Sequence, residues 1–100
     1  MTPEQTQSWI FLSVALGSQT APTDLEGISM IADGINHAIP TQKEMQSSIN
    51  WLIGKALIRK HGSKYDLTIL GKSLFAQVSA KNRTTMKIWK DIEKEIKNYA

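Results

Sequence analysis

The stretch 41–74 constrains the fold most, because a helical pattern in it gives way abruptly to a hairpin pattern. Thr41 follows a proline and precedes Glu44 by three residues, which is the spacing of a capping box at a helix start. Apolar residues then recur at helical spacing, at Met45, Ile49, Leu52, Ile53 and Ala56. The pattern predicts a helix over about 42–55 with one face buried.

The residues after this helix predict two short antiparallel strands. Leu57 to His61 is expected to form the first strand and Lys64 to Thr68 the return strand, in which polar and apolar residues alternate. Gly62-Ser63 between them is a turn pair of the kind that joins hairpin strands. A helix followed by a tight hairpin is typical of a winged helix-turn-helix.

The segment Tyr65 to Leu74, YDLTILGKSL, resembles the Y-x-L-T-x-x-G-x-x-L signature of winged-helix regulators such as the MarR and PadR families. Leu57 to Lys60 resembles the strand that enters their wing, and the resemblance covers residues 23–75. It implies a transcriptional regulator that binds double-stranded DNA, with a wing over 57–68. The Gly62-Ser63 turn is shorter than MarR-type wings and lacks their Asp-x-Arg, so the expected wing contacts are with phosphates rather than bases.

The predicted helix 42–55 has an exposed polar face that is the expected recognition surface. Gln and Asn can read adenine through paired hydrogen bonds, whereas Ser and Lys can contact phosphates or base edges. The candidate readers are Gln42, Lys43, Gln46, Ser47 and Asn50. The candidate phosphate contacts, to which His61 could add, are Lys55, Arg59, Lys60 and Lys64. An exposed polar helix face also occurs without any function, and the absence of Arg from this helix weakens the case for tight sequence-specific binding.

The charge of the chain is distributed unevenly along the sequence. Residues 1–41 contain four acidic residues and no Lys or Arg, whereas residues 42–90 contain ten basic and two acidic residues. The excess positive charge therefore coincides with the predicted recognition helix, the wing and the segment that follows. This distribution favours a nucleic-acid-binding surface.

Two helices are expected before the recognition helix. The first begins at Thr2 or Pro3 and ends near Gly17, and its broad apolar surface allows Trp9 to lie either in the core or at a subunit interface. The second is expected to begin at Thr23, which has Glu26 three residues later, and to carry a stripe as far as Ile39. A turn over 38–40 would then lead into the recognition helix.

Two more helices are expected after the hairpin. Thr68 should cap a helix that reaches about Ser79 and buries Leu70, Leu74, Phe75 and Val78. A final helix from Thr84 or Thr85 has a seam that either folds back on the domain or joins the first helix of a partner. PadR-like proteins dimerise through a helix in this position, and that resemblance implies a homodimer. The candidate interface residues are Trp9, Trp89, Ile92, Ile96 and Tyr99.

The composition excludes several other classes of function. Without cysteine, disulfides, thiolate metal sites and cysteine catalysis are impossible. A metal site built from Asp33, His37 and His61 is not expected, nor is any cofactor. No nucleophile elbow, zinc-protease motif or dinucleotide fingerprint occurs, so we do not expect an enzyme. The apolar run from Trp9 to Leu16 is too short to span a membrane, and we expect a cytoplasmic protein.

The sequence as a whole predicts a single domain over residues 1–100, mainly α with a small β-hairpin wing and an added C-terminal dimerisation helix over 84–100. Its expected function is DNA binding by a dimeric regulator. Two alternatives remain open: a winged-helix module that binds a protein through an exposed Trp51, and a small-molecule sensor with a cavity between the first and last helices of a dimer.

Overall fold

The computed structural model describes residues 1–99, and their architecture is mainly helical with a small three-stranded antiparallel sheet. The elements in chain order are α1 (Pro3–Gly17), β1 (Thr23–Asp24), α2 (Leu25–Asn36), α3 (Gln42–Gly54), β2 (Ile58–His61), β3 (Lys64–Leu67), α4 (Ile69–Lys81) and α5 (Thr85–Lys97). The expected order of helices and hairpin is therefore confirmed, and β1 is an addition to it.

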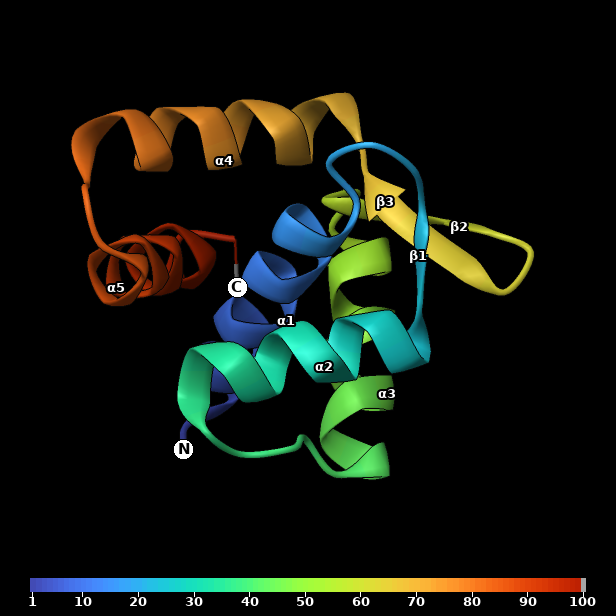
Figure 1. Cartoon of the computed structure of the whole chain (residues 1–100). Coiled ribbons are helices and arrows are strands. Elements are labelled where there is room, and N and C mark those ends of the chain that lie inside the picture. Colours follow the sequence, from blue (N-terminus) through green and yellow to red (C-terminus); the bar gives the residue numbers. More distant parts are fainter. Residues whose placement is uncertain (100) are drawn as a thin grey trace.

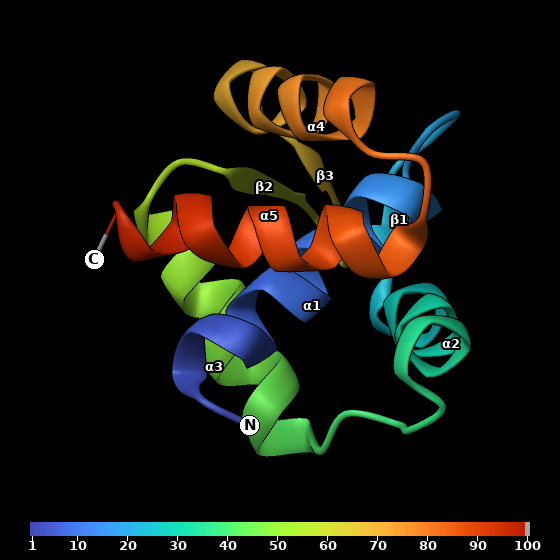
Figure 2. The ribbon, with the colours of Figure 1, turned by 90° about the vertical axis from the view of Figure 1, so that its left-hand side faces the viewer.

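Helix α1 lies at the centre, with α2, α3 and α5 packed around it (Figures 1 and 2). It starts with the capping box that its sequence allows, in which the Thr2 hydroxyl accepts from the Gln5 amide and the Gln5 side chain accepts from the Thr2 amide. From Ser8 to Ala15 every residue is buried. A helix that is apolar on all sides must be surrounded, and this decides the arrangement of the other helices.

Two tryptophans join α1 to its neighbours. The Trp9 indole N–H donates to the carbonyl of Ala32 in α2 at 2.9 Å. The Trp89 indole N–H, from α5, is shared between the Ser8 hydroxyl at 2.9 Å and the Gln5 carbonyl at 3.1 Å. The two rings also stack, with centroids 6.2 Å apart and planes 29° apart. Each buried indole thus has its polar atom satisfied while its ring fills the core.

This packing corrects the proposed dimer interface. Trp9, Trp89, Ile92 and Ile96 are buried within a single chain, and Tyr99 is half-buried against the same core. The seam of α5 folds back onto α1, which is the first of the two arrangements that its spacing allows. Dimerisation itself stays a prediction, but the four buried residues are already used by the fold and cannot form an exposed contact surface, and only part of Tyr99 is exposed.

The start of α2 differs from the prediction in its N-cap residue and in the short strand that precedes the helix. Asp24, not Thr23, is the N-cap, and its carboxylate accepts from the Gly27 amide at 2.8 Å. Thr23 instead pairs with Tyr65 as part of β1, so the sheet has three strands rather than two. Both residues can cap a helix. Thr is also suited to a strand because it is β-branched, and the neighbouring β3 decides the choice.

The end of α2 also comes earlier than predicted. The helix ends at Asn36, and His37 adopts a left-handed conformation with φ of 53°. Ile39 therefore lies outside the helix and is 71% exposed rather than part of the buried stripe. Pro40 disfavours helical backbone in the residue before it, so the chain turns before the apolar spacing runs out.

The two glycines of α2 have different surroundings. A Cβ on Gly27 would collide with the Thr23 side chain, so this glycine is explained by the short connection before the helix. A Cβ on Gly34 would meet nothing within 4 Å. Neither glycine is therefore explained by the close packing of another helix of the chain.

The hairpin is joined to α4 by a compact corner. The Thr68 hydroxyl donates to the carbonyl of Ala56 at 2.6 Å and accepts from the amide of Gly71 at 3.0 Å, which confirms Thr68 as the cap of α4. Gly71 packs against the backbone carbonyl of Leu57, where no side chain would fit. In α4, Leu74 and Val78 are buried as predicted, whereas Leu70 is 45% exposed and its predicted burial is wrong.

Candidate nucleic-acid interface

Helix α3 is held by a cap at its start and by one buried face. Its capping box is formed as predicted: the Thr41 hydroxyl accepts from the Glu44 amide at 3.1 Å, and the Glu44 carboxylate accepts from the Thr41 amide at 2.9 Å. Met45, Ile49 and Leu52 are buried. Ile53, which the apolar stripe also included, is 37% exposed. The only carboxylate of α3, that of Glu44, is hydrogen-bonded in this cap, and it borders the same hollow as Lys43 and Ser47.

All five candidate readers are exposed on α3. Gln42, Gln46 and Asn50 follow one another at four-residue spacing and form one stripe, in which the Gln46 amide nitrogen donates to the Asn50 side-chain oxygen at 3.0 Å. Lys43 and Ser47 form a second stripe, which borders a hollow of about 280 Å³ beside the first turn of α1. The outer face of α3 thus presents amide, hydroxyl and ammonium groups together.

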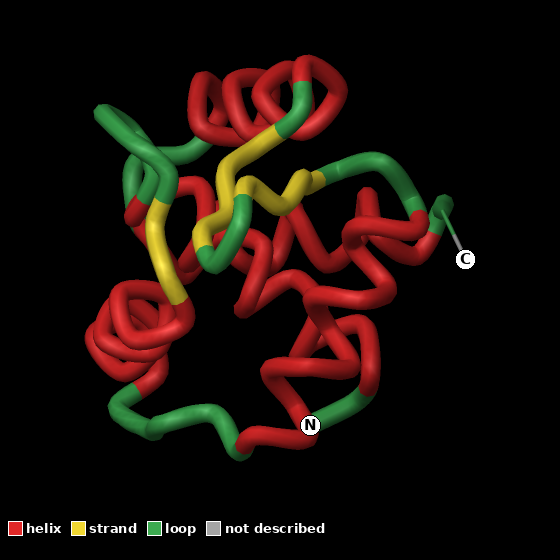
Figure 3. Tube along the Cα trace, turned by 90° about the vertical axis from the view of Figure 1, so that its right-hand side faces the viewer, coloured by secondary structure: helices red, strands yellow, loops and turns green. Residues whose placement is uncertain are grey.

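The β2–β3 hairpin lies beside α3, on the side of α1 away from α5 (Figure 1), and Figure 3 views it from its own side. Its turn holds only Gly62-Ser63, and Gly62 has the positive φ of 63° that such turns need. Arg59 pairs with Asp66 and His61 with Lys64 in the register. Because cross-strand partners share a face, these four side chains lie on one face of the sheet.

The carboxylate of Asp66, which was not among the candidates from the sequence, organises this face. One oxygen of Asp66 accepts from the Arg59 Nε and contacts the His61 Nε2, both at 2.9 Å. Burial alone would raise the pKa of Asp66. The hydrogen bonds and charges of Arg59 and His61 lower it by a larger amount, so the net pKa lies below its ordinary value. Arg59 is therefore partly neutralised and is a weaker phosphate contact than its exposure suggests.

The register shows how Asp66 could have been found. Asp66 lies between Tyr65 and Leu67, which are both buried, so it must point to the opposite face. A two-residue turn at 62–63 fixes its partner as Arg59. The alternation of polar and apolar residues in 64–67 and the length of the turn therefore indicate this pair from the sequence.

The remaining basic candidates have unequal surroundings. Lys55 is half-buried, and its ammonium lies 5.7 Å from the centre of the Trp51 ring. Within residues 1–99, Lys43, Lys60 and Lys64 make no ion pair. Asp24 is opposite Lys64 in the register and reduces the positive potential there. The structure thus places the nine DNA-binding candidates on α3, at its C-cap and on the adjoining hairpin, where Lys60, opposite Tyr65, lies on the other face of the sheet from Lys64.

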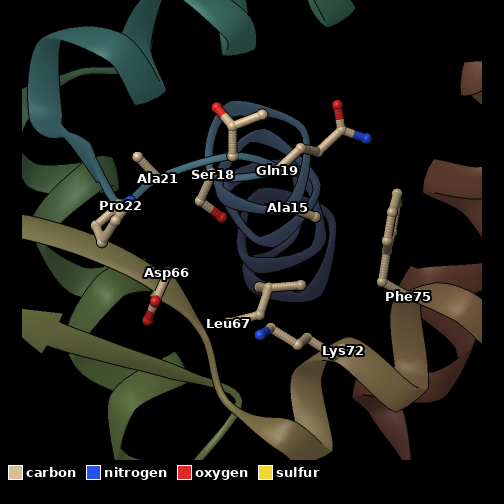
Figure 4. A pocket seen from close by; sticks show the side chains of 10 residues that line it. Ala15, Ser18, Gln19, Ala21, Pro22, Asp66, Leu67, Lys72 and Phe75 are labelled. Carbon is tan, nitrogen blue, oxygen red and sulfur yellow. The ribbon is translucent and has the colours of Figure 1, made fainter.

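A cavity of about 510 Å³ lies behind the hairpin, between the end of α1, the loop 18–22, β3 and α4 (Figure 4). Asp66 and Lys72 supply its charged groups, and Phe75 forms one apolar wall. This cavity lies away from α5 and is therefore different from the dimer-interface cavity of the sensor hypothesis, which stays a prediction. Asp66 lines this cavity and also holds Arg59, so the cavity adjoins the basic face of the hairpin.

Comparison with protein-family models, curated proteins and solved structures finds no match for this chain. No group of three or more His, Cys, Asp or Glu side chains within residues 1–99 is placed to hold a metal ion. The helices of the same residues include none with the length and apolar character needed to cross a membrane.

Proposed function

We propose that the protein is a winged helix-turn-helix DNA-binding protein that acts as a transcriptional regulator. In this proposal α2 and α3 are the helix-turn-helix, α3 enters the major groove, and the β2–β3 hairpin is a wing on the phosphate backbone. The observation that carries the proposal is the outer face of α3, which is polar, exposed and free of unpaired carboxylates, next to a hairpin with unpaired lysines.

The proposed contacts divide into two groups. Gln42, Gln46 and Asn50 carry amides that can form paired hydrogen bonds with adenine, so they are the proposed base readers. Lys43, with Lys60 and Lys64 of the hairpin, is proposed to neutralise phosphates. Arg59 contributes less because Asp66 competes with the phosphate for its guanidinium.

The test is the affinity for mixed genomic DNA fragments, measured by fluorescence anisotropy at two salt concentrations. The wild type should bind at low salt and weaken steeply as salt rises, because each neutralised phosphate releases counterions. Lys60→Ala/Lys64→Ala should lower the slope of log affinity against log salt by about two. Lys43→Ala/Gln46→Ala should weaken binding about tenfold or more.

The matched control is Lys94→Ala/Lys97→Ala. It removes the same net charge, but from α5, where these lysines pair with Asp91 and Glu93. It should leave the salt slope almost unchanged. Failure of the wild type to bind at low salt, or equal weakening by all three double variants, would rule out the proposed surface.

One observation favours the alternative of a protein-binding module. Asp66 and Asp24 place negative charge on the hairpin, where a DNA-binding face gains nothing from it. Trp51, however, is half-buried and lies under Lys55, so the exposed tryptophan that favoured a protein partner is missing. DNA binding therefore has the stronger support.

A further inference from the structure

The cavity behind the hairpin has the size of a small-molecule site (Figure 4). Its volume of about 510 Å³ lies within the range of about 300–1,000 Å³ that is usual for ligand pockets. Four segments that are distant in the sequence form it: the end of α1, the loop 18–22, β3 and α4. Two helices and a paired strand therefore hold most of its walls, and the cavity is part of the fold rather than the opening of a single loop.

Asp66 brings to this cavity a carboxylate oxygen that the fold does not use. Arg59 and His61 both contact the same oxygen, Oδ1, at 2.9 Å. No hydrogen bond within residues 1–99 reaches the other oxygen, Oδ2, although the Asp66 side chain is only 16% exposed. A carboxylate oxygen that is partly withdrawn from water gains when a donor approaches it, and charged donors form the strongest such bonds. Oδ2 is therefore a suitable acceptor for an ammonium group.

Lys72 supplies the opposite charge on another wall of the cavity. Its side chain is exposed and extends from α4 toward β3 (Figure 4). In the part of the chain that the structure describes, Lys72 takes part in no ion pair, so it does not neutralise Asp66 directly. The cavity thus offers a carboxylate and an ammonium group that are separate from each other, and each can bind a group of the opposite charge.

An apolar wall completes the cavity. The half-buried ring of Phe75 stands on the side of the cavity away from Asp66 (Figure 4). Leu67, Ala15 and Pro22 add further apolar surface. An aromatic group that packs on Phe75 gains from burial and from the contact between the rings.

We infer that this cavity binds a small zwitterion with an apolar body, of the class of a free aromatic amino acid. The ammonium group of the ligand donates to Oδ2 of Asp66, its carboxylate accepts from Lys72, and its ring packs against Phe75. A ligand with a single charge engages only one of the two charged walls. The inference does not rest on the proposed DNA binding, because none of these contacts uses α3.

The test is a titration of the isotope-labelled full chain with L-phenylalanine, followed by the backbone amide shifts in NMR spectra. Saturable shifts should appear at residues 18–22, 66–67 and 72–75 rather than on α3, with a Kd on the order of 1 mM or tighter. Phenethylamine lacks the carboxylate and hydrocinnamate lacks the ammonium group. Each should bind the wild type about tenfold more weakly than phenylalanine, because it loses one charge-assisted hydrogen bond.

Single substitutions assign the two charged contacts. Lys72→Gln should weaken phenylalanine about tenfold and leave phenethylamine almost unchanged, whereas Asp66→Asn should weaken phenylalanine and phenethylamine but not hydrocinnamate. Ala21→Trp should block the cavity without removing either charge, because Ala21 is exposed in the loop that lines it. Lys81→Gln is the matched control: it removes an exposed lysine of α4 that does not line the cavity, and it should bind phenylalanine as the wild type does.

Circular dichroism should show each variant folded, and the comparison of the three compounds on the wild type tests the inference even if a variant does not fold. The absence of saturable shifts with phenylalanine, or shifts that map away from the cavity, would overturn the inference. Equal binding of the three compounds would overturn it as well, because the two charged walls would then not recognise the ligand.

Discussion

Helices α3 and α5 make an instructive pair, because both have 13 residues, both are amphipathic and both pack on α1. The outer face of α5 mixes charges of both signs, and two of its lysines pair with carboxylates on the same helix. The outer face of α3 carries amides, hydroxyls and one lysine, and its only carboxylate is used in the cap. Their buried faces both serve the core, so only their outer faces distinguish a structural helix from a candidate binding helix.

The largest expected effect concerns the buried face of α5. Trp89→Ala should lower the free energy of unfolding by about 3–5 kcal/mol, because it leaves a cavity against Trp9 and removes the bonds to Ser8 and Gln5. Urea unfolding followed by circular dichroism measures the loss. Trp89→Phe should recover part of it by refilling the space. A loss below about 1 kcal/mol would show that α5 is not part of the cooperative core.

The next effect concerns the corner where the hairpin meets α4. Gly71→Ala should destabilise the fold by about 1–3 kcal/mol, because the added methyl group collides with the Leu57 carbonyl. Gly54→Ala is the matched control: it lies at the end of α3 with open space beside it, and it should be neutral or slightly stabilising. Equal midpoints in urea for the two variants would contradict the packing described here.

A smaller effect is expected at the start of α3. Thr41→Ala removes one capping bond and should cost about 1 kcal/mol, whereas Thr41→Ser should retain most of the stability. Thermal unfolding of the two variants separates the contribution of the hydroxyl to stability from that of the methyl group. If Thr41→Ala also weakens DNA binding beyond its effect on stability, the position of the first turn of α3 matters for the contact.

The smallest effect at neutral pH concerns Asp66. Its folded-state pKa is lowered, so its contribution to stability is present above the unfolded pKa and is lost as the pH falls through the folded value. Asp66→Asn should therefore be slightly less stable than the wild type at pH 7, by about 0.2–1 kcal/mol, and the difference should vanish in acid. Unfolding measured as a function of pH tests the sign.

The same substitution also tests whether the hairpin contacts DNA. Asp66→Asn leaves the guanidinium of Arg59 without its anionic partner, so DNA affinity should rise if the hairpin contacts phosphates. Unchanged affinity would place Arg59 outside the contact and leave α3 as the main binding element.

The sequence by itself determined most of the elements, because their signals are local. The cap at Thr41, the stripe through Met45 and Ile49, the two-residue turn at 62–63 and the cap at Thr68 each depend on a few neighbouring residues. The exposed readers of α3 followed from the same helical spacing. These features needed no knowledge of what the chain packs against.

Tertiary contacts decided the rest, since they join residues far apart in the chain. Thr23 entered a strand because β3 lay beside it, although its local sequence equally suits a helix cap. The seam of α5 was compatible with a partner or with its own α1, and the fit of Trp89 against Trp9, Ser8 and Gln5 settled it in favour of α1. Periodicity reports that a helix face is buried, but the surface that buries it depends on shape and hydrogen bonding across the whole domain.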